Sequence, residues 1–402
     1  MTVMTRLSAM AAAAVVAVGA ALVLPVTAGL AARPALAQPH VLDRAVTTAD
    51  ISLFGVSCLP ATSCLAVGQE STASNLGSDF AQAWNGRIWR VVTPPSPGSP
   101  AALNGVACTG KMSCIAVGGY ASPAGPGRAL AVAWDGRRWR VLRIPSPGDS
   151  ELSGISCPQP DRCVAVGDFL TIGARHTLAE AWNGKTWRIL PGPGTHSSDS
   201  VLRSVSCSTA NICFAVGLKR IDTAVPAKEV SLTETWNGTR WTVVPSPSPG
   251  TSVNDLTGLS CPGHRTCVAA GWLLNGRSPF SQPLAMRWDG IKWRLLHPLS
   301  AGPVTALDGI SCAHPAECMA IGAYLGKSGT HGLLAESWNG TRWRVLRTAA
   351  LVPAEANLLA ISCPRPGRCV AVGNYLCRTG TMRALAEEWN GGKWILINQT
   401  GA

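Results

Sequence analysis

The residues best suited to covalent chemistry in this sequence are its cysteines, and fourteen of the fifteen fall into seven pairs of identical spacing. Five residues separate the two members of each pair. Thiols this close can form a disulfide across a tight turn or contribute to a zinc site. A zinc site would need a second Cys or His pair nearby, and none follows, so the spacing favours disulfides. The predicted disulfides are Cys58–Cys64, Cys108–Cys114, Cys157–Cys163, Cys207–Cys213, Cys261–Cys267, Cys312–Cys318 and Cys363–Cys369.

Cys377 is the cysteine left over by this pattern, and it lies in a variable segment of the last repeat. Two interpretations stay open for it. It is either a free, buried thiol or a residue that joins a second chain or carries an attached group. We expect a monomer, with a Cys377-linked dimer as the alternative.

Tryptophans repeat with the same period as the cysteines. Fourteen of the fifteen belong to the pattern Trp-[Asn/Asp]-Gly-x-x-Trp, as at Trp182–Trp187. Asn and Gly tolerate positive φ, so the pattern predicts a hairpin turn with the two rings packed across it. Trp272 lies outside the pattern, which makes it the better candidate for an exposed binding contact.

The cysteines and tryptophans sit in a repeat of about 50 residues. Each repeat runs Leu-x-x-[Val/Ile/Leu]-[Ser/Ala]-Cys, then Cys-x-Ala and Gly, then a variable stretch and the tryptophan pair. Short apolar runs bounded by Gly, Pro and Asn-Gly predict four strands per repeat, in the third repeat at about 152–156, 164–168, 178–182 and 187–190. Seven such sheets packed radially can bury both of their faces. The sequence therefore predicts an all-β fold, a seven-bladed β-propeller of four-stranded blades that closes without strand exchange.

The first 37 residues predict export from the cell. Arg6 precedes a long uncharged apolar stretch, and Ala35-Leu36-Ala37 fits a signal-peptidase site. An uncleaved membrane anchor is the alternative, because the stretch is just long enough to span a bilayer, whereas no later segment is. We expect a secreted or cell-wall-associated protein of net charge +10 after cleavage. The predicted divisions are a signal peptide (1–37), a lead segment (38–52) and a propeller (53–402), with blades at about 53–102, 103–151, 152–201, 202–255, 256–306, 307–357 and 358–402.

Binding is expected on one face of the ring. The disulfide turns and tryptophan hairpins are short and uniform, so we interpret their face as structural. The variable connections lie on the opposite face, where recognition usually occurs. Aromatic and basic side chains there would suit a glycan or an acidic polymer. The predicted ligand-binding residues are Trp272, Tyr120, Phe169, Tyr324, Tyr375, Arg175, His176, Arg277 and His331.

Two resemblances follow from these motifs. The hairpin at Trp182–Trp187 resembles the Asp-box hairpin of sialidase-type propellers. Over residues 53–397 the repeat resembles secreted actinobacterial Cys-x5-Cys propellers, which are loosely similar to kelch and galactose-oxidase propellers. The resemblance implies the fold and export. The arginine triad and nucleophilic tyrosine of sialidases, and the two Tyr and two His copper ligands of galactose oxidases, are not apparent in a chain with three Tyr.

The leading hypothesis is an exported, non-catalytic binding or scaffold propeller that recognises a glycan, an acidic polymer or a protein through its variable face. The sequence predicts no cofactor, no metal and no specific nucleic-acid partner. The alternative is an enzyme on the same propeller, either a carbohydrate-active glycosidase or lyase or a metal-dependent oxidase. A glycosidase would need two carboxylates about 5–10 Å apart near the axis of the ring.

Overall fold

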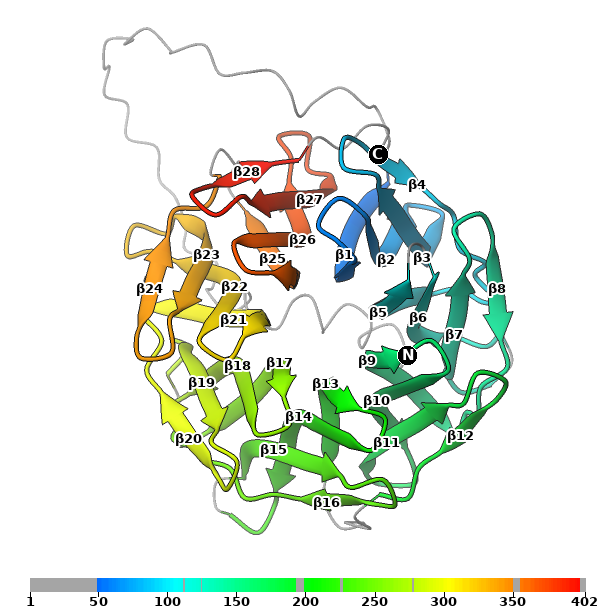
Figure 1. Ribbon diagram of the computed structural model, residues 1–402, viewed down its shortest axis with the longest axis horizontal. Helices are drawn as coiled ribbons and strands as arrows, with labels where there is room; N and C mark the ends of the chain where they lie inside the picture. The colour runs from blue at the N-terminus through cyan, green and yellow to red at the C-terminus, as the bar shows by residue number, and fades with distance from the viewer. Residues whose placement is uncertain are drawn as a thin grey trace, which may run out of the picture.

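The computed structural model describes residues 49–110, 113–123, 125–192, 199–224, 227–276, 278–349 and 355–397. Within these ranges the regular elements are strands, which form seven four-stranded sheets, each built from consecutive strands. Figure 1 shows the sheets arranged around a common axis, with the first strand of each blade innermost and the fourth outermost. The predicted all-β, seven-bladed fold is confirmed, and the ring closes without strand exchange. The predicted signal peptide lies outside the described residues, and within them no helix could span a membrane.

All seven blades have the same antiparallel order, first strand to fourth. The strands of blades 1 to 4 are β1 (Asp50–Cys58), β2 (Cys64–Thr72), β3 (Asn75–Trp84), β4 (Trp89–Val91), β5 (Ala101–Gly110), β6 (Ser113–Tyr120), β7 (Arg128–Trp134), β8 (Trp139–Leu142), β9 (Asp149–Gln159), β10 (Arg162–Leu170), β11 (Arg175–Trp182), β12 (Trp187–Ile189), β13 (Ser200–Thr209), β14 (Ile212–Ile221), β15 (Lys228–Trp236) and β16 (Trp241–Val243). Those of blades 5 to 7 are β17 (Val253–Gly263), β18 (Thr266–Leu274), β19 (Gln282–Trp288), β20 (Trp293–Leu296), β21 (Val304–His314), β22 (Glu317–Leu325), β23 (His331–Trp338), β24 (Trp343–Leu346), β25 (Ala356–Arg365), β26 (Arg368–Leu376), β27 (Met382–Trp389) and β28 (Trp394–Leu396).

The apolar core lies between the blades. Seven clusters of buried side chains each join two neighbouring sheets. The cluster that closes the ring brings Leu53 of blade 1 against Val370 and Val372 of blade 7. Because every blade buries apolar side chains against both neighbours, a single blade would leave two apolar faces in water. The closed ring is therefore the stable unit.

Each innermost strand has a β-bulge four residues before its first cysteine. In β5, Leu103 pairs with Gly118 and Gly105 pairs with Val117, which leaves Asn104 without a partner on β6. The same shift occurs in all seven blades. A Cβ on Gly118 would lie 1.9 Å from the carbonyl oxygen of Ala102, so this position requires glycine. The close approach explains the Gly that follows Cys-x-Ala in every repeat.

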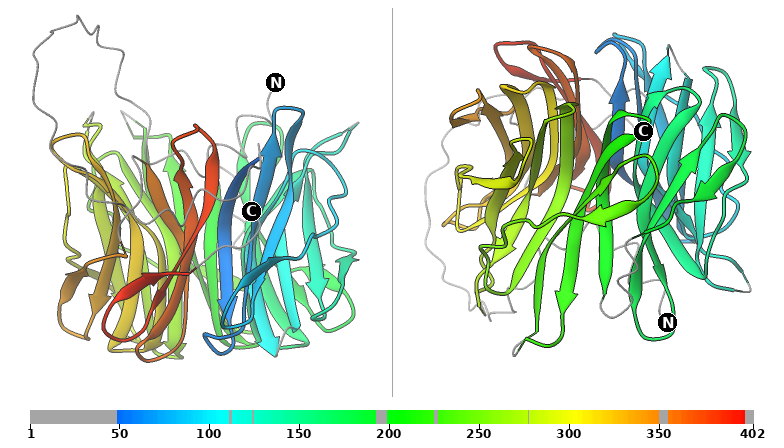
Figure 2. Two further views of the ribbon diagram at one scale, coloured as in Figure 1. Left: turned by 90° about the horizontal axis from the view of Figure 1, so that it is seen from above. Right: turned by 60° about the horizontal axis from the view of Figure 1, so that its bottom comes forward.

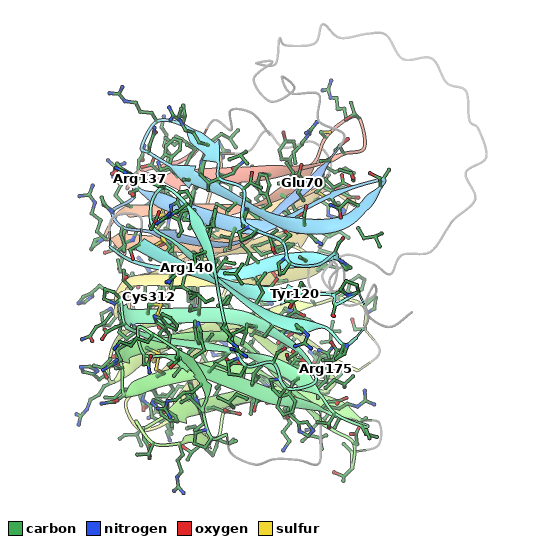
Figure 3. All side chains as sticks on the ribbon, turned by 90° about the vertical axis from the view of Figure 1, so that its right-hand side faces the viewer. Glu70, Tyr120, Arg137, Arg140, Arg175 and Cys312 are labelled. Atoms are coloured by element: carbon green, nitrogen blue, oxygen red, sulfur yellow. A yellow bond between two sulfur atoms is a disulfide. The ribbon has the colours of Figure 1, made fainter. Side chains whose placement is uncertain are left out.

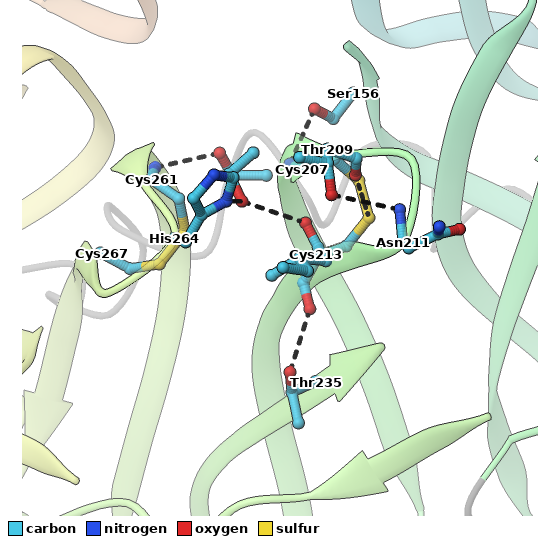
Figure 4. Close-up of a disulfide and its surroundings, with 12 residues drawn as sticks. Ser156, Cys207, Thr209, Asn211, Cys213, Thr235, Cys261, His264 and Cys267 are labelled. Carbon is cyan, nitrogen blue, oxygen red and sulfur yellow. Dashed lines mark hydrogen bonds between the residues drawn. A yellow bond between two sulfur atoms is a disulfide. The ribbon is translucent and has the colours of Figure 1, made fainter. Parts of the chain in front are cut away.

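The cysteine pairs form disulfides across the turn between the first two strands of each blade, with Cα atoms 3.9 to 4.1 Å apart. The serine before the first cysteine links neighbouring blades: Ser156 Oγ accepts the N–H of Cys207 at 3.0 Å (Figure 4). Five other interfaces repeat this bond, including the closing one, where Ser362 Oγ accepts the N–H of Cys58 at 3.1 Å. At the remaining interface Ala107 has no hydroxyl to offer Cys157.

The tryptophan pairs pack across the hairpin of the third and fourth strands, with ring centroids 5.1 to 5.9 Å apart. In the hairpin of blade 3, Asn183 Oδ1 accepts the N–H groups of Lys185 and Thr186, and Gly184 has φ of 89°. The side chain of Asn or Asp thus closes the turn by itself. The Thr186 hydroxyl also donates to Asn183 Oδ1, at 3.4 Å.

The strands extend further toward the variable face than the sequence predicts. In blade 3 the ladder between β10 and β11 continues to the pair Leu170 and Arg175, so most of the predicted 169–177 loop is paired strand. The prediction was too short because polar residues such as His176 and Arg175 break the apolar run without breaking the ladder. Backbone hydrogen bonding does not need apolar side chains.

Candidate binding site on the axial strands

The ring has two faces with different architecture. The turn face holds the disulfide turns and tryptophan hairpins. The loop face holds the connections between second and third strands and between successive blades. Figure 3 shows Arg137 and Cys312 toward the turn face and Glu70, Tyr120 and Arg175 toward the loop face, while Figure 2 shows the strands running between the two.

The bulge residues differ strongly from blade to blade. The preceding position is Leu in every blade, but the bulge residue changes from aromatic to aliphatic, polar and charged. A bulge re-aims its side chain, and bulges are common beside functional sites. In chain order the bulge residues are Phe54, Asn104, Ser153, Arg203, Thr257, Asp308 and Leu359.

Two bulge residues reach an acid on the next blade, two positions earlier on its innermost strand. Asn104 Nδ2 donates to Glu151 Oε1 at 2.6 Å and to the carbonyl of Leu152 at 3.0 Å. Arg203 donates from Nη2 and Nε to the two carboxylate oxygens of Asp255, at 3.2 and 3.5 Å. Because the bulge has the same geometry in every blade, the type of residue at this position determines whether it makes a polar contact with the next blade.

These contacts belong to a larger polar group beside the axis, which we call the axial cluster. Arg175 Nη1 lies 3.1 Å from Asp168 Oδ2, and Asp168 pairs directly with Glu151 across β10 and β9. The guanidinium groups keep partial access to water: the side chains of Arg175 and Arg203 are 29% and 27% exposed. The cluster consists of Asn104, Glu151, Asp168, Arg175, Arg203, Asp255 and Asp308.

Acids outnumber bases in the axial cluster, and burial perturbs them. Burial, and next the Asp168 carboxylate, raise the pKa of Glu151 to about 7 against the hydrogen bond from Asn104. Burial, and next the Asp255 carboxylate, raise the pKa of Asp308 to about 7. The Asp255 carboxylate in turn raises the pKa of Arg203. Perturbed carboxyls of this kind gather at functional sites, and here a nearby positive charge would favour their ionised form.

Two of the predicted ligand-binding residues lie at the axial cluster. Arg175 is a member of it, and half-buried Trp272 on β18 pairs in register with Asp255. Phe169 and His176 sit one residue further out on the same blade as Asp168 and pack ring to ring, with centroids 5.3 Å apart. His176 Nε2 also bonds to Thr171 Oγ1 at 2.8 Å.

The remaining predicted residues are spread around the ring. Tyr120, Tyr324 and Tyr375 occupy the same place as Phe169 in their own blades, two residues after the conserved Gly. Tyr375 is 4% exposed and packs in the cluster of blades 6 and 7, whereas Tyr120 and Tyr324 are partly buried. His331 begins β23 and is half-buried. Arg277 lies outside the described residues.

Cys377 is unpaired and 7% exposed, beside Tyr375 in the same apolar cluster. Its Sγ lies 2.9 Å from Thr379 Oγ1. A link to a second chain would require this segment to open. Among the described residues, no three His, Cys, Asp or Glu side chains gather as a metal-binding group.

Sequence reasoning missed Asn104, Glu151, Arg203, Asp255 and Asp308. It searched the connections between strands, because variability there is easy to see. The signal was available inside the repeat, in the first x of Leu-x-x-[Val/Ile/Leu]. Its polarity changes from blade to blade, while the residue before it is always Leu and the residue after it is always small.

Comparisons with known proteins establish the fold. No protein-family model and no curated protein matches the chain. The β-propeller domain of the Trilobed protease from Pyrococcus furiosus, described as having an open velcro topology, has a TM-score of 0.53 and 8% identity and covers 89% of this chain and 100% of that chain. YCF48 bound to a D1 peptide has a TM-score of 0.50 and 16% identity, covering 89% of this chain and 95% of that one. At these identities the likeness shows that the chain is a β-propeller and assigns it to no family.

Proposed function

We propose that this protein is an exported, non-catalytic binding propeller whose loop face takes a polypeptide segment carrying positive charge. The observation that carries the proposal is the excess of acids in the axial cluster. Its acids are Glu151, Asp168, Asp255 and Asp308, and its bases are Arg175 and Arg203. Seven disulfides support an oxidising location outside the cytoplasm.

The excess of acids in the axial cluster is the reason for proposing a positively charged ligand. Two carboxyls, Glu151 and Asp308, have pKa values near neutrality, so a cation beside them would be bound together with release of their protons. Half-buried Trp272 beside Asp255 offers an aromatic face to the same ligand, and Trp is the best side chain for contact with a cation. The structure of a fold relative, YCF48, with a D1 peptide is a precedent for a propeller that binds a peptide.

The test is binding of peptides of about 15 residues, each made in a lysine- and arginine-rich form and in a charge-reversed form. We expect the exported protein to bind basic forms and to lose about tenfold in affinity in the variant Glu151→Gln with Asp308→Asn. The matched control is Asp135→Asn with Asp161→Asn, which removes two acids from the turn face. Other blades have Asn at the corresponding positions, so the turns should be preserved. Equal binding of both peptide forms, or equal loss in the control, would contradict the proposal.

A carbohydrate-active enzyme is the second candidate, because Glu151 with its raised pKa lies beside Asp168, which is held by Arg175. A carboxyl with a raised pKa beside a second carboxyl is typical of the acid and base pairs of glycosidases. Three of the four acids are already bonded to Asn or Arg, which favours binding over catalysis. Release of reducing sugar from uronate or neutral polysaccharides, abolished in Glu151→Gln, would favour the enzyme.

A further inference from the structure

The turn face carries cations that its fold does not require. Every Trp-[Asn/Asp]-Gly-x-x-Trp hairpin has Lys or Arg at one or both x positions, in all seven blades. In every blade the Asn or Asp side chain closes the turn by accepting a backbone N–H from an x position. Of the basic side chains at these positions, Arg138 alone has a described bond to the turn residue, from Nε to Asp135 Oδ2. All of these cations are exposed. They are Arg87, Arg137, Arg138, Lys185, Arg240, Lys292, Arg342 and Lys393, and we call them the hairpin cations.

Further basic side chains lie on the same face, and its acids are largely neutralised. The disulfide turns add exposed Arg162, Arg265 and Arg365. The ion pairs Arg138–Asp135, Arg162–Asp161, Arg294–Asp289 and Arg368–Glu388 engage four acids of this end of the ring. Among the described residues, Arg138 is the hairpin cation with an acid at ion-pair distance, so the other hairpin cations leave a net positive charge that attracts anions.

We propose that the turn face docks on an anionic lipid bilayer. Hairpins of equal length place the cations at one end of a ring of similar blades, which presents them to a planar partner rather than to a small one (Figure 2). Each Lys or Arg close to an anionic leaflet strengthens binding by about fivefold. Several hairpins acting together suffice for reversible binding.

Two features of the turn face favour lipid over a soluble polyanion. Ile291, at the tip of the blade 5 hairpin, is 84% exposed, and Leu59, in the disulfide turn of blade 1, is 37% exposed. Apolar side chains among cations suit the interface of a bilayer, which a soluble polymer does not offer. A cavity of about 370 Å³ also opens between blades 3 and 4, lined by Arg162, Arg188 and the hairpin residues Trp182 and Asn183. Arg162 is already paired with Asp161, and the exposed guanidinium of Arg188 is the group in this lining that suits a lipid phosphate.

The experiment is sedimentation with vesicles, using protein released by an exporting host. The probes are phosphatidylcholine alone and phosphatidylcholine with roughly 30 mol% phosphatidylglycerol. We expect binding only to the anionic vesicles and its loss in about 0.5 M NaCl. The variant Arg87→Gln, Lys185→Gln, Arg240→Gln and Lys292→Gln should lose about 600-fold in partition coefficient, which is about fivefold for each of the four charges removed.

A charge-matched control separates the face from the net charge. Arg128→Gln, Lys219→Gln, Lys228→Gln and Lys327→Gln remove four cations from the loop face and should change vesicle binding less than about threefold. Equal losses in the two variants would overturn the proposal, as would binding to soluble polyphosphate without binding to anionic vesicles. Peptide binding at the axial cluster should be unchanged in the hairpin variant, so this proposal and the proposed function can fail separately.

Discussion

At the scale of residues, the serine that precedes the first cysteine in six of the seven blades has a role that the sequence does not reveal. Its hydroxyl bonds to the backbone of the neighbouring blade, and six of these bonds connect the blades, including the last to the first. The Ser-Cys dipeptide therefore combines a covalent link within a blade and a hydrogen bond between blades.

We expect Ser362→Ala to lower the free energy of unfolding by about 1 kcal/mol, because the N–H of Cys58 then loses its acceptor. The reverse change, Ala107→Ser, supplies a hydroxyl to Cys157 and should stabilise the ring by a similar amount. Urea unfolding of both variants measures the effect. Stabilisation by Ser362→Ala, or a loss in Ala107→Ser, would contradict this role.

Buried carboxyls make the stability of the ring depend on pH. Burial raises the pKa of Glu180 from its ordinary value of 4.5 to about 8, and that of Glu234 to about 7. The folded protein thus holds protons that the unfolded chain has released. The stability that these protonated carboxyls contribute is fully present below about pH 4.5 and is lost as the pH rises toward 8.

Glu180→Gln should remove part of this dependence. Near pH 4 its free energy of unfolding should equal that of the wild type, and near pH 8.5 it should be higher by roughly 4 kcal/mol, since Gln carries no charge to bury. Urea denaturation at the two pH values measures both. A variant less stable than the wild type at the higher pH would show that the Glu180 carboxylate is stabilised by its surroundings.

At the scale of elements, the bulge of the innermost strand is the feature that builds the candidate site. The Leu before the bulge, which recurs in every blade, pairs with a Gly on the second strand, and this pair fixes the register. The bulge residue itself has no partner there, so it is available for contacts with the next blade.

Deleting Asn104 should therefore be far more harmful than changing it. The deletion shifts the start of β5 by one residue and turns fully buried Leu103 away from the core. We expect the melting temperature to fall by about 10 °C or more. Asn104→Ser, which places the residue of blade 3 in blade 2, should cost only a few degrees. Similar melting temperatures for the two would mean that the bulge is not required.

The sequence predicts the fold well and the candidate site poorly, for a physical reason. Repeated Cys, Trp and Gly mark contacts that every blade makes in the same way, so one sequence displays them seven times. The contact between Arg203 and Asp255 joins two positions 52 residues apart and occurs at one interface, so no pattern within the chain displays it. Its existence depends on the bulge and on the packing of two blades.

At the scale of the whole molecule, the axial cluster and the turn face differ in charge. The axial cluster toward the loop face has more acids than bases, whereas the hairpin cations crowd the turn face. A ring docked on an anionic surface by its turn face would present the axial cluster outward, free to bind a basic segment. The short, uniform face that we interpreted as structural thus has a role in orientation.

Hydrogen–deuterium exchange of the protein with a bound basic peptide tests the central claim directly, because it locates the ligand on the ring. The account predicts slower exchange in the loop-face halves of the innermost strands, at 149–153, 253–257 and 304–308, with no change in the hairpins at 85–88 and 183–186. Protection of those hairpins without protection of the innermost strands would contradict it.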